Sequence, residues 1–350
     1  MLAADSKVAA GPARDIENAE AADSWKNLID PVEPFLHAVN QRLAEQVDAF
    51  HPDIVPYADY ALNGQGKHLR PALVALSANA LGKITDSHVT VAVIIEMVHL
   101  ATLVHDDVMD EAEIRRRRLT LAANWGNEIA VLFGDCLFAQ ALKLAASFPT
   151  PEICRAVAMA TNTVCAGEIL QLQHRRDFEF SRKQYFKALE MKTAELFALS
   201  SELSGCLSGT ADETRQTLRR FGLAFGTAYQ LFDDCVDLFG SEAAAGKSLG
   251  TDLAKGKLTL PVLLLWERAD EADRRRMQDL IQDWQPGSIK RLGKLLVQHE
   301  TLNASLQTIH QYLEQARRWL RGLPAPEGSS GLFGLTEYLA RQTEALGVCA

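Results

Sequence analysis

Two short acidic segments carry the side chains of this sequence that are most suited to chemistry. One reads HDDVMD and the other, far along the chain, reads FDDCVD. Positions i and i+4 of a helix differ by about 40° around its axis, so Asp106 and Asp110 share one face, as do Asp233 and Asp237. A bound cation would remove the repulsion between such carboxylates. Because Mg²⁺ prefers oxygen ligands and keeps substrate phosphates in its shell, the pattern predicts metal ions that bridge to a phosphorylated ligand.

Two other interpretations fit one such segment taken alone. A solvated helix end also gathers aspartates, and paired carboxylates can act as general acid and base. Both segments, however, end an apolar helical pattern rather than follow a polar face, and each holds three aspartates. The pair therefore favours metal binding, and only the fold can bring the two segments together.

Several cations accompany the aspartates. The stretch GQGKHLRPAL places Lys67 and Arg70 just before a helix start at Pro71, which suits an anion. His99 lies seven residues before Asp106 and so points in nearly the same direction. The four arginines after the first acidic segment can bind phosphate through paired hydrogen bonds, and the acidic surroundings disfavour a nucleic-acid role. Further lysines stand at Lys192, Lys247, Lys255 and Lys257. Together these groups fit two diphosphates with bound Mg²⁺.

The segments that must position these groups are nearly all helical in pattern. Apolar residues recur at spacings of three and four, and alternating strands with hairpin turns are missing. Because no linker is long enough to divide the chain, we expect an all-α single domain over 25–350 behind a disordered segment 1–24. Helices are predicted at 35–50, 71–81, 89–110, 127–147, 152–173, 184–207, 212–239, 259–268, 274–284 and 302–321.

Composition narrows the class of protein. The 350 residues are 47% hydrophobic and 23% charged, as in ordinary globular proteins, and the net charge of −9 disfavours nucleic-acid binding. Six scattered cysteines without a CxxC pair favour a reducing, cytoplasmic location. The longest apolar run, 89–104, is interrupted by Glu96 and His99, and we interpret it as too short and too polar for a transmembrane segment.

The ordered blocks resemble the trans-isoprenyl diphosphate synthases, also called polyprenyl synthetases. GKHLRP resembles the GKxxRP of that family, and HLATLVHDDVMD with two following arginines resembles its first aspartate-rich motif. WGNEIAVLFGDCLFAQA, MKTA, YQLFDDCVD and GKSLGTDLAKGKLTLP resemble the remaining blocks. The resemblance spans about residues 30–345 and rests on specific motifs.

The resemblance implies a helical bundle around a deep central cavity, usually as a homodimer, that joins isopentenyl diphosphate to an allylic prenyl diphosphate. Isopentenyl diphosphate would bind Lys67, Arg70, His99 and Arg116. The allylic diphosphate would bind Arg115, Lys192, Thr193, Gln230, Lys247 and Lys257. Asp106, Asp110 and Asp233 would ligate Mg²⁺, with Asp107, Asp234 and Asp237 in support. Catalysis would therefore depend on Asp106, Asp107, Asp110, Asp233, Asp234 and Lys192. Release of the product at a membrane surface is compatible with this chemistry.

Product length should follow from the side chains that close the cavity. In family members with short products, bulky residues just before the first acidic segment often do so. Here Ala101 and Thr102 are small, and Val98 lies deeper on the same helix. We therefore expect a long all-trans product of the octaprenyl type, with Phe133 and Phe138 as candidate floors. A short-chain farnesyl or geranylgeranyl diphosphate synthase is the alternative.

The loop after the first acidic segment departs from the family pattern. RRRRLT stands where the family often has RRGxPT, so Arg117 and Leu119 replace a flexible and a rigid residue. Other classes also stay open: a class I terpene cyclase, a non-catalytic subunit of a heteromeric synthase, and a helical scaffold with charged ends. The second DDxxD and the complete set of blocks favour the synthase.

Overall fold

The structure, a computed structural model, describes residues 25–62, 66, 68–116, 118–240, 249–285, 287–324 and 326–349. These residues are almost entirely helical, which confirms the all-α prediction. The segment 1–24 and the side chains Lys67, Arg117 and Lys247 lie outside the described residues, so the expectations stated for them stay predictions.

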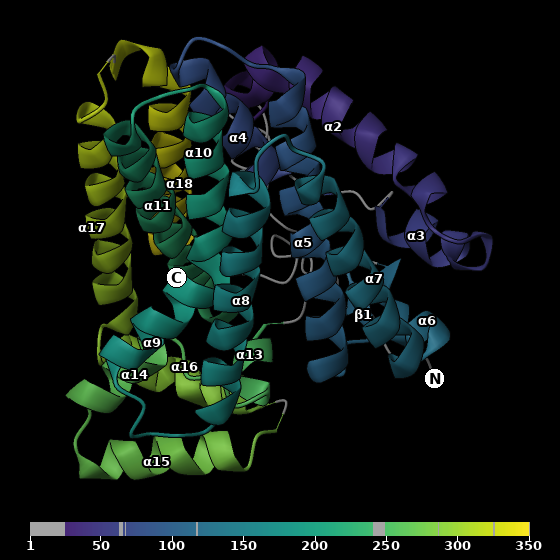
Figure 1. The fold of residues 1–350 in the computed structure, drawn as a ribbon. Coiled ribbons are helices and arrows are strands. Elements are labelled where there is room, and N and C mark those ends of the chain that lie inside the picture. Colours follow the sequence, from purple (N-terminus) through teal and green to yellow (C-terminus); the bar gives the residue numbers. More distant parts are fainter. Residues whose placement is uncertain are drawn as a thin grey trace, which may run out of the picture.

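The described helices form one bundle with smaller helices at its ends (Figure 1). In Figure 1, α17, α11, α10, α8 and α5 stand upright, and α15 lies across one end. Four short 3-10 helices occupy Asp30–Val32, Val47–Ala49, Pro52–Ile54 and Pro326–Ser329. The helices are α2 (Glu33–Glu45), α3 (Val55–Leu62), α4 (Leu69–Ala80), α5 (Asp86–Met109), α6 (Leu121–Trp125), α7 (Asn127–Ala146), α8 (Glu152–Gln173), α9 (Arg182–Leu189), α10 (Glu195–Leu207), α11 (Asp212–Phe239), α13 (Thr251–Ala254), α14 (Leu260–Arg268), α15 (Glu271–Gln282), α16 (Ser288–Gln298), α17 (Thr301–Arg321) and α18 (Ser330–Cys349).

Helix α5 is the central element that carries the first acidic segment. It packs most extensively on α7 and also touches α2, α4 and α10, which explains why it is apolar nearly all round. Its start is fixed by a capping box, in which the Thr85 amide donates to Nδ1 of His88 at 3.1 Å. It ends at Met109, so the first acidic segment emerges from the core at the last turn.

The MKTA block differs from the single helix predicted at 184–207. A five-residue π-helical turn, Glu190–Ala194, separates α9 from α10. Helix α8 approaches it so closely that a Cβ on Gly167 would lie 2.5 Å from the Lys192 backbone nitrogen. π-Turns are frequent at functional sites, because the extra residue re-aims neighbouring side chains. Here the side chains concerned are Lys192 and Thr193.

Other sequence predictions need smaller corrections. The helix expected at 35–50 ends at Glu45, and α16 and α18 were not among the predicted helices. The arginine-rich loop forms a small antiparallel hairpin, β1 (Ile114–Arg115) with β2 (Arg118–Leu119). Ladder pairing over such short strands leaves no alternating apolar pattern for a sequence reading to find.

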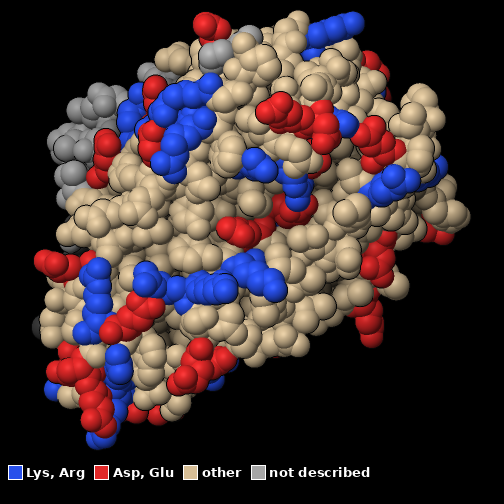
Figure 2. Space-filling view, turned by 60° about the vertical axis from the view of Figure 1, so that its left-hand side comes forward, with Lys and Arg blue, Asp and Glu red and all other residues tan. Residues whose placement is uncertain are grey.

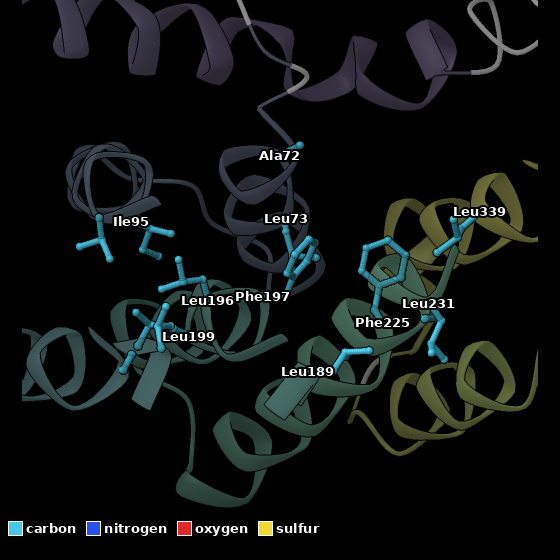
Figure 3. Packing of buried hydrophobic residues seen from close by; sticks show 14 of the residues in the cluster. Ala72, Leu73, Ile95, Leu189, Leu196, Phe197, Leu199, Phe225, Leu231 and Leu339 are labelled. Carbon is cyan, nitrogen blue, oxygen red and sulfur yellow. The ribbon is translucent and has the colours of Figure 1, made fainter. Parts of the chain in front are cut away.

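The core fills the space between α4, α5, α10, α11 and α18. Figure 3 shows their apolar side chains pointing into this interior, with Phe197 of α10 and Phe225 of α11 among the labelled residues. The two rings lie 5.9 Å apart between centroids. Gly222 permits this approach of α11 to α10, because a Cβ there would lie 2.4 Å from the Phe197 carbonyl oxygen. The close contact fixes how the second acidic segment on α11 faces the bundle.

The prediction that the apolar run at 89–104 is too short and too polar to span a membrane was wrong. Three described helices, α5, α7 and α8, are long and apolar enough to cross a membrane by those two criteria. For α5, 67% of the most apolar stretch is buried inside the protein, so its packing accounts for its composition. The corresponding shares for α7 and α8 are 39% and 33%, so these two helices present apolar surface. On the face of the molecule shown in Figure 2, Lys and Arg side chains lie interspersed with Asp and Glu side chains.

Candidate active site

A cavity of about 1320 Å³ brings the two acidic segments to one place. Its walls come from α5, α7, α8, the π-turn, α11 and the segment 251–257. With the exception of Asp237, the described residues that the sequence predicted as substrate or metal ligands line it: Arg70, His99, Asp106, Asp110, Arg115, Arg116, Lys192, Thr193, Gln230, Asp233 and Lys257. A small polar recess of about 60 Å³ adjoins the cavity and is also lined by Asp234. The cavity and the recess share five lining residues: Lys192, Thr193, Gln230, Asp252 and Lys257.

Asp110 is surrounded by cations. Its Oδ2 lies 2.8 Å from Nζ of Lys257 and 3.3 Å from Nζ of Lys255. Its Oδ1 accepts a hydrogen bond of 2.8 Å from Arg175. Burial would raise the pKa of Asp110, but the two lysines outweigh burial and lower it. The carboxylate is therefore ionised at neutral pH.

The other aspartates of the first segment differ from Asp110. Burial raises the pKa of Asp106 although Lys192 Nζ lies 3.5 Å from its Oδ2. Asp107 points away from the cavity, where its Oδ1 accepts a hydrogen bond of 2.7 Å from Nε of Arg115. Asp107 therefore contacts the arginine loop rather than the cavity, and its expected catalytic role stays a prediction.

The three aspartates of the second acidic segment lie in three different environments. Asp233 lines the cavity opposite the first segment. Asp234 accepts hydrogen bonds from Tyr185 at 2.5 Å and Gln230 at 2.8 Å, and burial raises its pKa to about 8. The spacing argument made Asp237 a metal candidate, but the structure buries it completely and away from the cavity wall. Its oxygens accept hydrogen bonds from Thr251 Oγ1 at 2.9 Å and the Asp252 amide at 3.2 Å.

The Asp237 geometry therefore corrects its predicted role. An i+4 position on a helix wheel says which way a side chain leaves the axis, and α13, which packs against α11, decides what it meets. Helix α13 brings Asp252 to the cavity in place of Asp237. The GTD in GKSLGTDLAKGKLTLP was the available signal, but only the lysines of that block were singled out.

Glu168 is a second acidic residue that the sequence reading missed. It lies on α8 in the block GEILQ, lines the cavity and forms an ion pair with Lys192. Lys192 Nζ also donates to Oε1 of Gln171 at 3.1 Å, and Thr193 Oγ1 donates to Gln230 Oε1 at 3.1 Å. The π-turn thus positions one cation and one hydroxyl between α8 and α11. The sequence signal that could have revealed Glu168 was a glutamate inside the largely apolar helical pattern at 152–173, because glutamate is seldom buried without a partner.

A pocket of positive groups lies farther up α5. Arg70 is half-buried, its guanidinium carbon stands 4.6 Å over the Phe197 ring, and its buried Nε has no described hydrogen-bond partner. Burial and the neighbouring Arg70 lower the pKa of His99 well below the usual value. Glu96, for which the sequence suggested no role in the site, lies among them with Oε1 3.5 Å from Nδ1 of His68. Burial opposes its ionisation, but His68, His99 and Arg70 outweigh burial and lower its pKa to about 2.

The predicted chain-length residues are only partly at the cavity wall. Thr102 and Phe138 line the cavity, whereas Ala101, Val98 and Phe133 are buried in the core and are not among its lining residues. The family resemblance suggested that Ala101 faces the cavity, but the packing of α5 against its neighbours covers that position. The prediction for Ala101 and Val98 is therefore corrected in favour of Thr102.

The carboxylates at the cavity suit a hard divalent cation only when a bound phosphate ligand supplies further oxygen atoms. Asp106, Asp110, Asp233 and Asp252 offer carboxylate oxygens to one cavity. Among the described residues, no three His, Cys, Asp or Glu side chains are grouped closely enough to hold a metal unaided. Mg²⁺ commonly takes one or two carboxylates and completes its shell with substrate phosphates, which this arrangement permits.

Comparison with known proteins agrees with this architecture. The family model described as polyprenyl synthetase matches residues 51–297. The octaprenyl diphosphate synthase of Haemophilus influenzae is 32% identical over 319 residues, covering 91% of this chain and 96% of that protein. The crystal structure of a decaprenyl diphosphate synthase from Rhodobacter capsulatus has a TM-score of 0.85 and 32% identity, covering 91% of this chain and 99% of that one. A polyprenyl synthase of Caulobacter crescentus, solved with calcium and isoprenyl diphosphate, has a TM-score of 0.82 and 30% identity, over 91% and 97% of the two chains. The chain therefore belongs to the polyprenyl synthetase family, whose members are trans-prenyltransferases.

Proposed function

We propose that this protein is a Mg²⁺-dependent synthase that joins isopentenyl diphosphate to an allylic diphosphate and makes a long all-trans polyprenyl diphosphate. The observation that carries the proposal is a large cavity among the described residues, which is lined by two acidic segments, a set of cations and several apolar side chains. Neither a terpene cyclase nor a scaffold would need a second buried cationic pocket beside the acidic segments.

The two diphosphates are assigned from the positions of the cations. Lys192, Lys257 and Arg115 stand close to the aspartates and would bind the allylic diphosphate, together with Thr193 and Gln230. Arg70, His99 and Arg116 would bind isopentenyl diphosphate. Lys67 and Lys247 join these sets on the family pattern alone.

The residues at the first site stabilise departure of the allylic diphosphate. When bound, Mg²⁺ held by Asp106, Asp110 and Asp233 would neutralise charge on the leaving diphosphate. Lys192, Lys257 and Arg115 donate hydrogen bonds to the same oxygens as the carbon–oxygen bond breaks and its electron pair leaves with the diphosphate. The double bond of isopentenyl diphosphate then attacks the allylic carbon. The proton lost afterwards goes to the departed diphosphate.

A long product is supported by the size and lining of the cavity. Small-molecule pockets are roughly 300–1,000 Å³, and this cavity of about 1320 Å³ is larger. The small side chain of Thr102 leaves room below the first acidic segment. The relatives named octaprenyl and nonaprenyl diphosphate synthases support the same product class.

We further propose a homodimer, in the cytoplasm, formed through α7 and α8. Leu132 is 62% exposed and Met159 is 64% exposed on these helices, which present apolar surface that a second copy would cover. Leu132→Asp and Met159→Asp should each give a single-chain mass by light scattering, while Val297→Asp on α16, 65% exposed, should not. A single-chain mass for the wild type would contradict the dimer.

The synthase proposal is tested by product analysis. Purified protein is incubated with isopentenyl diphosphate, Mg²⁺ and farnesyl or geranylgeranyl diphosphate, and the dephosphorylated products are sized. We expect long prenols from the wild type, loss with Asp106→Asn or Asp233→Asn, and wild-type products from Glu113→Gln, whose side chain is exposed. No elongation with any allylic primer would overturn the proposal and point to a non-catalytic subunit.

A further inference from the structure

The hairpin that follows the first acidic segment is tied to α3, an element outside the acidic segments. Tyr60 of α3 donates a hydrogen bond of 2.6 Å from its hydroxyl to the carbonyl oxygen of Leu119. The guanidinium carbon of Arg118 stands 4.2 Å over the Tyr60 ring. Trp125 of α6 packs edge-on against the same ring, with centroids 5.0 Å apart. Three contacts from three positions thus converge on one tyrosine.

The contacts of Tyr60 with Arg118 and Leu119 can affect the position of Arg116, because the hairpin that contains Arg116, Arg118 and Leu119 is short. The ladder pairs Ile114 with Leu119 and Arg115 with Arg118, so Arg116 stands in the turn directly beyond the paired residues. Its backbone is left-handed, with φ of 50°, a conformation that non-glycine residues adopt only when neighbours impose it. On the other side, Arg116 lies against the loop before α4, since a Cβ on Gly66 would lie 2.7 Å from an Arg116 guanidinium nitrogen.

Arg115 does not depend on these ties to the same degree. Its Nε donates to the Asp107 carboxylate at 2.7 Å, so the acidic segment itself fixes this side chain. The hairpin therefore holds its two leading arginines in different ways. Asp107 on α5 fixes Arg115, and Tyr60 on α3 fixes the strand that carries the turn of Arg116.

We propose that Tyr60 and Arg118 are positioning residues that set Arg116 for isopentenyl diphosphate. This inference rests on the proposed function of the cavity. It also gives a task to Leu119, which stands where the chain departs from the family pattern, and to its neighbour Arg118: the Leu119 carbonyl accepts the Tyr60 hydrogen bond, and Arg118 covers the Tyr60 ring. The clamp, meaning Tyr60, Arg118 and Leu119, joins α3 to the hairpin whose turn carries Arg116.

The test compares Michaelis constants for the two substrates. Tyr60→Phe removes one hydrogen bond, and Arg118→Gln removes the cation over the ring. Each should raise KM for isopentenyl diphosphate roughly three- to tenfold, and leave KM for the allylic diphosphate and kcat within about twofold. Arg118→Lys should restore part of the loss. Tyr57→Phe is the matched control, because Tyr57 packs on the same Trp125 ring at 5.3 Å and lies outside the hydrogen bond.

A second measurement does not need turnover. Amide hydrogen exchange in Ile114–Arg115 and Arg118–Leu119 should be faster in Tyr60→Phe than in wild type and Tyr57→Phe, at unchanged melting temperature. Equal rises in both KM values, or the same behaviour in Tyr57→Phe, would overturn the clamp. So would unchanged exchange in the hairpin. If the wild type did not elongate any primer, the proposed function would fail, and hydrogen exchange would still decide the clamp.

Discussion

Glu96 offers a sharp test of the electrostatic reasoning, because it is a carboxylate inside a pocket of cations. The perturbation is Glu96→Gln, which keeps the shape of the side chain and removes its charge. The wild-type residue is 5% exposed and its pKa falls from the usual 4.5 to about 2. Since each pKa unit is worth about 1.4 kcal/mol, the ionised group contributes on the order of 3 kcal/mol to folding.

The sign of the pH dependence follows from the lowered pKa. Between about pH 4.5 and 2 the unfolded chain binds the proton and the folded chain does not. The contribution of Glu96 is therefore fully present above pH 4.5 and is lost as the pH falls toward 2. In the variant, Arg70 also loses a buried carboxylate partner, and leaving a cation without its partner is costly.

The assay is urea unfolding of wild type and Glu96→Gln, followed by far-ultraviolet circular dichroism at several pH values. We expect a difference in unfolding free energy on the order of 3 kcal/mol at pH 7 that narrows steadily below pH 4.5. Glu113→Gln, an exposed glutamate, should differ from wild type by less than about 0.5 kcal/mol. A difference below about 1 kcal/mol at pH 7, or one that stays constant with pH, would refute the reasoning.

Three further predictions concern product length, packing and acid stability. Thr102→Phe, which places a ring in the cavity wall, should shorten the main product of the elongation assay, and an unchanged product would remove Thr102 from the growing chain's path. Gly222→Ala should destabilise by roughly 1–3 kcal/mol or more in urea unfolding, because its Cβ would meet the Phe197 carbonyl oxygen at 2.4 Å. Gly293→Ala, with nothing within 4 Å, should be stabilising by about 0.5–1 kcal/mol, and equal effects of the two would contradict the packing argument. Burial lowers the pKa of His88, so its contribution to stability is complete above its usual value of 6.5 and is lost as the pH falls below it. Melting temperatures at pH 7.5 and 5.5 for wild type and His88→Gln should show a smaller drop in the variant.

Most of the helices, and most of the charged residues that line the cavity, could be predicted from the sequence alone. Spacings of three and four reveal helices because they depend only on a residue and its neighbours along one chain segment. The same local reasoning found the two acidic segments, and the described aspartates and cations that it selected meet at one cavity, with Asp107, Asp234 and Asp237 behind its wall or in the adjoining recess. It also predicted the class of product, through the small residues before the first acidic segment.

Only the tertiary structure decided which member of each segment faces the cavity. Asp237 meets the amide of Asp252 rather than the ligand, and Ala101 is covered while Thr102 is not. Glu96 and Glu168 became visible as buried partners of cations that come from other helices. The reason is that a helix wheel gives a direction, whereas what lies in that direction is set by elements far away in the sequence. The hydrogen bond from Tyr60 to Leu119, 59 residues apart, is such a contact, and no local pattern contains it.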